Sequence, residues 1–520
     1  MQPDTTRRGA LIGLGAAALA SPGVAKAGRP APVVATSHGR VRGARHDGVL
    51  VFKGVRYGAD TGPRRFQPPA SPKPWSDIQD ALVFGPGSPQ RGLGADGPTA
   101  EDCLFLNIWT PGADQARRPV MVYIHGGAYS AGSGSSPLYE GTRLARRGDV
   151  VVVTLNHRLG ALGYLSLGRL GEPRFADSGN AGQLDLVLAL QWVRDNITAF
   201  GGDPGKVTVF GQSGGGAKIA TLMAMPAARG LFHRAATMSG QQVTASGPLN
   251  AERRARTFLE ALKATPDQLA DLPVEALIDA AGARDPILPT GALYFGPVLD
   301  DRSLTRHPFW PDAPPQSADI PMIIGNTKDE TRAFLGGDER NHRLTWDELP
   351  ARLGPELRVD ISPETVVAEY RALYPAWTPS QVFFAASTAS RSWRAAVIEA
   401  EARARQGSPA FVYQLDWQAP SGAGAPHTLD IPLVFGTLDA SGSITGTATD
   451  ARAVSEAMQD AFIAFARHGR PDHAALPAWA PYDLPARRTM IFDTPCRMAD
   501  DPRGRERELF ARVPYIQPGT

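Results

Sequence analysis

Short apolar or β-branched runs recur along the chain and predict buried strands. Several of these runs are continuously apolar instead of alternating, which is typical of strands covered on both faces of a mostly parallel sheet. The predicted strands are residues 104–109, 120–124, 150–155, 207–210, 322–324, 411–415 and 490–492. Apolar side chains near helical spacing predict a helix over residues 182–200, and residues 217–228 and 253–264 are also predicted to be helical.

Strands and helices alternate through most of the chain, and this order favours one large α/β domain over residues 28–520. No internal repeat and no linker rich in Pro, Ser and Gly divides that domain. Residues 270–318 and 344–393, where aromatic residues stand among prolines, are the expected excursions from the sheet. We therefore predict a large, mostly parallel central sheet flanked by helices, with cap-like insertions.

The first 27 residues have the pattern of an export signal peptide. Arg7 and Arg8 precede a weakly apolar run at residues 9–20, and a small-x-small cleavage motif ends at Ala27. The arginine pair favours the twin-arginine type, although Ala10 stands where that signal usually has Phe. We expect cleavage near Ala27 and a periplasmic or extracellular location. A disordered start with a chance arginine pair is the alternative.

Composition and charge indicate a globular chain and bear on which partners are to be expected. The apolar fraction of 42% is that of an ordinary globular chain, and 54 basic against 52 acidic residues leave a formal net charge of +2. This balance gives no electrostatic reason to expect nucleic acid or an anionic membrane as a partner. Outside the N-terminal 27 residues, no stretch approaches the length of about 18 uninterrupted apolar residues that a membrane-spanning helix requires. Cys103 and Cys496 are too few for a disulfide framework or a metal site.

Residues 207–217 carry the strongest chemical signal: a strand, a serine flanked by glycines, and then a helix. A serine hydroxyl is a poor nucleophile at neutral pH, so it must be presented to a general base. A sharp strand–Ser213–helix turn does this, and Gly211 and Gly215 are expected where a Cβ would clash. This Gly-x-Ser-x-Gly pentad occurs once in the chain. The alternative reading is a glycine-rich turn without chemistry.

A second glycine-rich loop, residues 125–129, directly follows the predicted strand 120–124. Its small residues allow the backbone to approach a substrate carbonyl and to donate N–H groups to a developing oxyanion. Gly127 and Ala128, together with Gly214 after the nucleophile, are predicted to form a three-donor oxyanion hole. The alternative is an ordinary Gly-Gly turn, which two such loops in a consistent order make less attractive.

Further segments resemble the signatures of the type-B carboxylesterase family, which includes the cholinesterases. They are residues 52–55, 65–66, 101–107, 156–160, 179–182, 196–204 and 465–469. The resemblance runs from about Val33 to Asp493, and bacterial carboxylesterases of the para-nitrobenzyl esterase type are the closer likeness. It implies the α/β-hydrolase fold and the hydrolysis of carboxylic esters.

The base and its orienting acid are expected downstream, because hydrolases of this fold follow the order Ser, Asp or Glu, His. Residues 323–330 form a buried-looking strand that ends in Asp329 and Glu330. In the family's matching stretch the second acid serves, so the resemblance implies Glu330, with Asp329 as the rival. Residues 426–436 match the family's histidine loop and make His427 the base. The triad Ser213, Glu330 and His427 requires no metal and no organic cofactor.

Three differences separate the chain from the family pattern. Gln212 stands where cholinesterase-like relatives commonly carry Glu, so a charge beside the nucleophile is absent. Ser88 stands where the family's early disulfide has a cysteine, so the resemblance predicts that Cys103 is a free, buried thiol. No aromatic residue lies between these two positions to bind a quaternary ammonium, which argues against choline esters.

The leading hypothesis is an exported serine carboxylesterase that hydrolyses uncharged, moderately apolar small-molecule esters through an acyl-enzyme. One alternative is a catalytically silent binding or adhesion protein, since the family includes such members. Another is hydrolysis of amides, lactones or carbamates by the same triad. The sequence indicates no oligomeric state.

Overall fold

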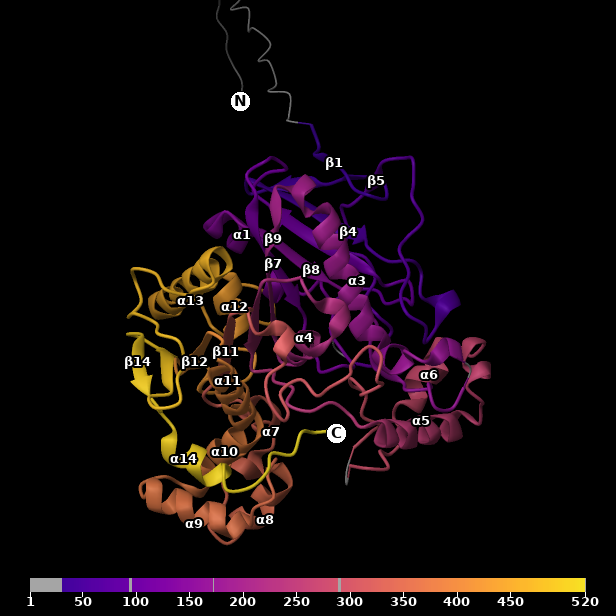
Figure 1. Ribbon diagram of the computed structural model, residues 1–520. Helices are drawn as coiled ribbons and strands as arrows, with labels where there is room; N and C mark the ends of the chain where they lie inside the picture. Colours follow the sequence, from indigo (N-terminus) through magenta and orange to yellow (C-terminus); the bar gives the residue numbers. More distant parts are fainter. Residues whose placement is uncertain (1–29, 93–95, 172, 289–290, 520) are drawn as a thin grey trace, which may run out of the picture. The chain divides into compact units, whose positions relative to one another are not determined.

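A mixed sheet of 11 strands organises the computed structural model, which describes residues 30–92, 96–171, 173–288 and 291–519 (Figure 1). The predicted export signal lies outside the described residues. Pro32–Thr520 form one compact unit. In order across the sheet the strands are β14 (Arg497–Asp500), β13 (Arg488–Phe492), β12 (Ala410–Leu415), β11 (Met322–Thr327), β10 (Arg234–Met238), β9 (Gly202–Gln212), β7 (Arg118–Ile124), β8 (Val151–Leu155), β6 (Phe105–Thr110), β4 (Val49–Arg56) and β3 (Ala44–His46).

The strands from β13 to β8 run parallel to one another, while β14 at one edge and β6, β4 and β3 at the other pair antiparallel. A small second sheet joins β1 (Val33–Ala35), β2 (Arg40–Arg42) and β5 (Gln79–Asp80). The prediction of a large, mostly parallel central sheet is confirmed.

Helices cover both faces of the sheet, because successive strand residues point to opposite sides. One face packs against α3 (Ala181–Asn196), α4 (Gly214–Ala224) and α11 (Arg394–Gln406). The other packs against α1 (Thr142–Gly148), α12 (Asp430–Phe435) and α13 (Thr449–His468).

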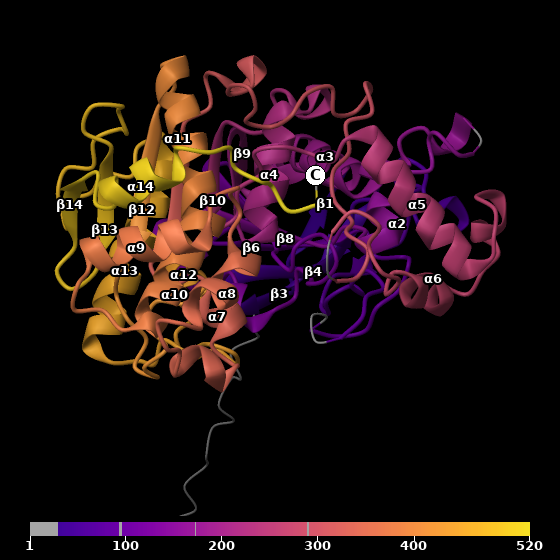
Figure 2. The same cartoon turned by 90° about the horizontal axis from the view of Figure 1, so that it is seen from below.

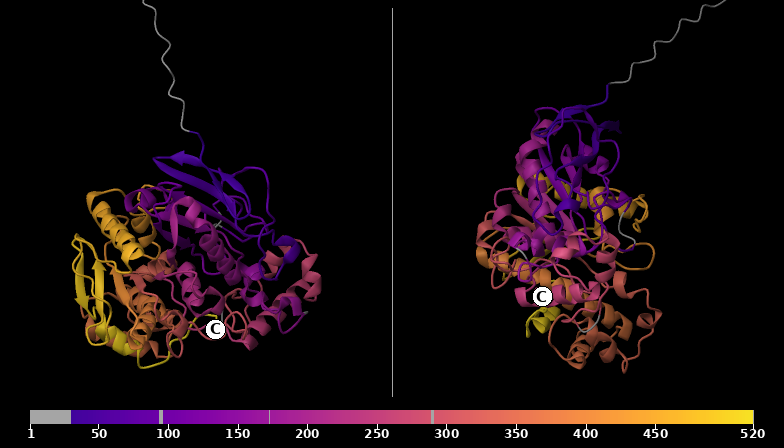
Figure 3. Two further views of the ribbon diagram at one scale, coloured as in Figure 1. Left: turned by 45° about the horizontal axis from the view of Figure 1, so that its top comes forward. Right: turned by 90° about the vertical axis from the view of Figure 1, so that its right-hand side faces the viewer.

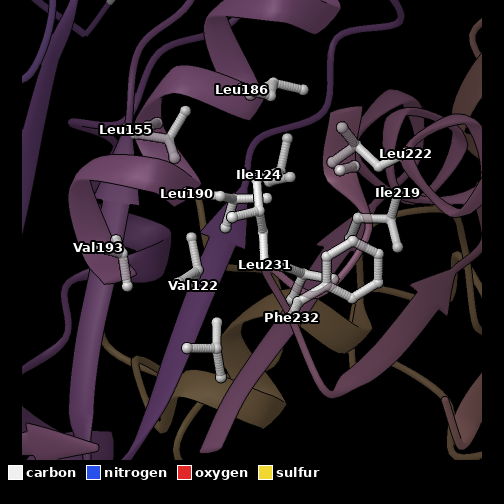
Figure 4. Close-up of a cluster of buried hydrophobic side chains, with 14 of the residues drawn as sticks. Val122, Ile124, Leu155, Leu186, Leu190, Val193, Ile219, Leu222, Leu231 and Phe232 are labelled. Carbon is white, nitrogen blue, oxygen red and sulfur yellow. The ribbon is translucent and has the colours of Figure 1, made fainter. Parts of the chain in front are cut away.

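The alternation is visible along β7. Val122 and Ile124 point toward Leu190 of α3 and Ile219 of α4 (Figure 4). Met121 and Tyr123 join the cluster on the opposite face. Burying one such aliphatic side chain contributes about 1.5–3 kcal/mol to stability. Both faces of the central strands are therefore core, which explains the continuously apolar runs.

Two insertions add small cores of their own, and they lie apart from each other (Figures 2 and 3). The first contains α5 (Pro248–Leu262) and α6 (Val274–Ala280), whose Phe258 and Leu277 share one apolar cluster. It begins earlier than the predicted excursion at residue 270, because the apolar face of α5 packs on this cluster. The second contains α8 (Leu349–Leu353), α9 (Pro363–Leu373) and α10 (Pro379–Thr388), against which α14 (Gly504–Phe510) packs.

Two elements differ from the pattern-based expectation. Strand β10 is absent from the predicted set, because its Arg-Ala-Ala-Thr-Met sequence has little β-branched character, yet it is held between β9 and β11. Helix α4 begins at Gly214 and not at residue 217, although glycine disfavours helix. Short helices α2 (Gly160–Tyr164) and α7 (Arg332–Leu335) complete the fold. None of the helices within the described ranges combines the length and apolar composition that a membrane crossing requires.

Candidate active site

The predicted site residues lie in the segments that directly follow β7, β9, β11 and β12, the strands labelled in Figure 1, and Gly214 is the first residue of α4. These strands are parallel, so their carboxyl ends meet at one edge of the sheet, where α/β folds commonly bind ligands. Ser213 and His427, which are more than 200 positions apart in the sequence, therefore lie at the same edge of the sheet.

Ser213 occupies a strained turn between β9 and α4. Its backbone has φ 56° and ψ −127°, a conformation that costs a residue with a side chain about 1–3 kcal/mol. Its N–H donates to Met238 O at 2.8 Å, which ties the turn to the end of β10. A Cβ on Gly211 or Gly215 would lie 2.6 Å or 2.0 Å from Ile124 O. The expectation that both flanking positions require glycine is confirmed.

Gly240 is a further glycine of this turn that sequence reasoning missed. A Cβ at this position would lie 1.7 Å from Ser213 O. The residue follows β10, and since that strand was not predicted, nothing in the sequence placed Gly240 beside the nucleophile. It allows the β10 loop to pack directly on the strained turn.

The predicted oxyanion residues lie against one another. A Cβ on Gly214 would lie 2.1 Å from Ala128 O, and one on Gly126 would lie 3.2 Å from Ser213 Cβ. Gly127 and Ala128 both have positive φ, 80° and 51°. Among the described residues, the backbone N–H groups of Gly127, Ala128 and Gly214 have no hydrogen-bond acceptor. Three unpaired donors beside a strained serine form a site suited to a negatively charged oxygen.

Glu330 and His427 are in direct contact. His427 Nδ1 and Glu330 Oε2 share a short hydrogen bond, and the Glu330 side chain is fully buried. Glu330 Oε1 also accepts from Thr327 N–H at 2.8 Å. Burial by itself would raise the pKa of Glu330, but the contact with His427 and the hydrogen bond from the Thr327 N–H outweigh it and hold that pKa below its ordinary value. The carboxylate is therefore ionised and orients the imidazole through Nδ1.

Asp329, the rival acid, faces elsewhere. Its Oδ2 accepts from Ala425 N–H at 2.9 Å, and Oδ1 lies 3.7 Å from Arg332 Nε. The structure thus brings Glu330, and not Asp329, to His427. The neighbouring acid stabilises the histidine loop at a different point.

Gln212 links the nucleophile strand to the histidine. Its amide nitrogen lies 3.3 Å from Nδ1 and 3.2 Å from Nε2 of His427. Because both ring nitrogens are nearly equidistant, the amide lies against the face of the imidazole. Within the described residues no hydrogen bond joins the Ser213 hydroxyl to His427, and catalytic contacts of this kind commonly tighten only when substrate binds.

Two further side chains surround His427 and were not singled out from the sequence. The ring of Phe334, 48% exposed, lies 4.8 Å from the imidazole and forms an apolar wall beside it. Asp430 is buried and accepts from Tyr413 Oη at 2.8 Å; burial raises its pKa to about 6. Asp430 belongs to the predicted histidine loop, whereas no sequence signal marks Phe334.

Cys103 is a free, buried thiol, as predicted, and burial raises its pKa. Ser88 lies beside it and accepts from Leu159 N–H at 3.1 Å. Within the described ranges, no group of three or more His, Cys, Asp or Glu side chains is arranged to hold a metal ion.

Known proteins resemble this chain over nearly its whole length. The model of the carboxylesterase family matches residues 30–509. The para-nitrobenzyl esterase of Bacillus subtilis is 38% identical over 498 residues, 92% of this chain and 98% of that protein. The phenmedipham hydrolase of Pseudarthrobacter oxydans is 32% identical over 475 residues, 86% of this chain and 92% of that protein.

The fold resemblance is equally extensive. The crystal structure of the Geobacillus stearothermophilus carboxylesterase EST55 matches with a TM-score of 0.83 and 38% identity, covering 92% of this chain and 99% of that one. The predicted α/β-hydrolase fold is confirmed. The names of these relatives, esterases and hydrolases, also disfavour the alternative of a silent binding protein.

Proposed function

Because the chain belongs to the carboxylesterase family and is a carboxylic ester hydrolase, we propose that it works as a serine esterase through an acyl-enzyme. Ser213 is the nucleophile, His427 the general base and Glu330 the residue that orients the base. The contact between the buried Glu330 carboxylate and His427 Nδ1 carries this proposal. It leaves Nε2 as the nitrogen that exchanges a proton with the serine.

In the proposed first step, His427 Nε2 accepts the Ser213 proton while Oγ attacks the ester carbonyl carbon. The resulting oxyanion accepts hydrogen bonds from Gly127, Ala128 and Gly214. The imidazolium then gives its proton to the alcohol oxygen, the carbon–oxygen bond breaks and the alcohol departs. Water repeats the sequence on the acyl-enzyme and releases the acid, which regenerates the serine.

Uncharged small-molecule esters are the proposed substrate class. Besides the orienting carboxylate of Glu330, the side chains that contact the His427 ring include the neutral amide of Gln212 and the apolar ring of Phe334. Neither provides an ion-pair partner for a charged acyl or alcohol group. Both are compatible with moderately apolar esters, for which desolvation in the site costs little.

The decisive experiment is hydrolysis of para-nitrophenyl acetate and butyrate by wild type and by Ser213→Ala. Wild type is expected to release a burst of nitrophenol followed by steady turnover, and the variant is expected to lose both. Ser421→Ala, which removes a hydroxyl from an exposed loop, is the matched control and keeps wild-type rates. A burst that survives in Ser213→Ala would refute the assignment of the nucleophile.

Amide, lactone or carbamate hydrolysis is the competing use of the same triad. Amides demand protonation of a poorer leaving group, so an enzyme adapted to them retains substantial rates on both members of a matched pair. Values of kcat/KM measured in parallel on an ester and on the amide of the same acid with the same substituent distinguish an esterase from an amidase. We expect the ester to be preferred by several orders of magnitude.

We also propose that residues 1–27 direct export of the enzyme. The proposal rests on Arg7 and Arg8, the apolar run and the cleavage motif ending at Ala27. Cell fractionation after replacement of both arginines by lysine tests it. Retention of the precursor of the double-lysine variant in the cytoplasm supports a twin-arginine signal. Unchanged export of that variant contradicts the twin-arginine type.

A further inference from the structure

Lys218 is fully buried on α4, the helix that follows the nucleophile. Its Nζ donates to the backbone oxygen of His125 at 3.1 Å. In the part of the chain that the structure describes, no carboxylate pairs with this ammonium. A lysine buried without an ion-pair partner opposes folding, so packing by itself does not explain its presence.

The contacts of Lys218 lie at both ends of the oxyanion loop. His125, whose carbonyl it binds, directly precedes Gly126, and the face of the Tyr129 ring lies 5.6 Å from Nζ on the other side of Ala128. Tyr129 is itself fixed, because its hydroxyl donates to Gln242 Oε1 at 2.9 Å. One side chain therefore connects both ends of the loop to the helix that carries the third predicted oxyanion donor.

The groups that face Lys218 add no opposing charge. The rings of His125 and His157 stack at 4.9 Å, and burial, followed by the nearby lysine, lowers the pKa of both, that of His125 to about 3. Burial raises the pKa of Tyr129, so the phenol is neutral as well. Helix α3, packed against α4, carries Asp185, but that carboxylate is bound to Arg158.

An unopposed positive charge is useful where negative charge develops. The carbonyl held by Lys218 belongs to the peptide group that leads into Gly126, whose Cα faces Ser213. In a buried site of low dielectric, a fixed cation stabilises an oxyanion that exists only in the transition state. A neutral apolar residue of the same length would satisfy packing and would lack this effect.

We propose that the protonated Lys218 is a positioning residue of the esterase: it fixes both ends of the oxyanion loop and adds positive charge beside the hole. This inference rests on the proposed acyl-enzyme mechanism. Burial lowers the pKa of Lys218 to about 7, so the protonated fraction declines as the pH rises through neutrality. The wild-type kcat is therefore expected to fall on the alkaline side of about pH 7.

The test compares wild type with Lys218→Met, which keeps chain length and removes the charge. At pH 6.5 we expect kcat for para-nitrophenyl butyrate to fall about 10- to 100-fold with little change in KM, because the loss concerns the transition state. The alkaline decline of kcat should disappear in the variant. Lys206→Met, at an exposed lysine of β9, is the matched control with wild-type kcat and pH profile.

An apolar residue in place of a buried ammonium is expected to maintain or raise the thermal midpoint, whereas a structural lysine would lower it. A Lys218→Met enzyme with wild-type kcat and an unchanged alkaline limb overturns the proposal. If that variant does not fold, the wild type decides: affinity for a trifluoromethyl ketone, which forms an oxyanion on Ser213, must fall above pH 7. If the affinity for the ketone and kcat both stay constant from pH 7 to 9, the proposal is overturned. Failure of the acyl-enzyme mechanism is a different result, because it would appear as activity in Ser213→Ala.

Discussion

Replacing Gly215 by Ala tests the geometry of the nucleophile turn most directly. The new Cβ would lie 2.0 Å from Ile124 O, whereas real Cβ contacts are essentially never below 3.0 Å, so about 1.0 Å of displacement is required. The obstacle is backbone, and the first turn of α4 has to move away from the end of β7. That turn carries Gly214 N–H and directly follows Ser213.

A misplacement of about 1 Å at reacting groups lowers the rate about 100-fold. At about 1.36 kcal/mol for each factor of ten, this corresponds to a loss of about 2.7 kcal/mol in transition-state stabilisation. Overpacking should also lower the free energy of unfolding by about 1–3 kcal/mol. Steady-state kinetics on para-nitrophenyl butyrate and urea unfolding measure the two effects.

Gly337→Ala is the matched control, because it adds the same methyl group at an exposed position with no atom within 4 Å. It is expected to leave both kcat/KM and the unfolding free energy unchanged. If Gly215→Ala shows the same kcat/KM and unfolding midpoint as wild type, the proposed packing of the turn against β7 is refuted.

Substitutions of three carboxylates give further predictions. Glu330→Gln is expected to lower kcat by about 10⁴-fold, the scale seen when a triad acid loses its charge, whereas Asp329→Asn, on the acid that does not contact His427, should retain most activity. Burst kinetics on a chromogenic ester distinguish them, and the reverse ranking would favour Asp329 as the triad acid. Burial raises the pKa of Glu399 from 4.5 to about 8, so the folded state resists ionisation and loses stability as the pH rises from 4.5 toward 8. Glu399→Gln should therefore stabilise the protein by up to about 3 kcal/mol at pH 7 and by little at pH 4.5, measured by urea unfolding, and equal stabilisation at both pH values would contradict the assignment.

Local pattern was sufficient for the elements that carry their own signal. Continuous apolar runs located strands β7, β8, β11 and β12, because residues buried on both faces of a sheet have to be apolar along their whole length. The spacing of Gly211 and Gly215 around Ser213 predicted a sharp turn. Strand β10 carried no such signal, since its place between β9 and β11 comes from pairing with neighbours and not from its composition.

Only tertiary structure decided which groups touch. Asp329 and Glu330 are adjacent in sequence and equally acidic, but the backbone after β11 directs one toward Ala425 and the other toward His427. No sequence pattern marks Gly240 or Lys218 as part of the site. Gly240 matters because it packs against the Ser213 carbonyl, and Lys218 because it binds the oxyanion loop, and both partners follow other strands. Sequence determines side-chain chemistry and local conformation, whereas the distances between chemical groups depend on how remote strands align in the sheet.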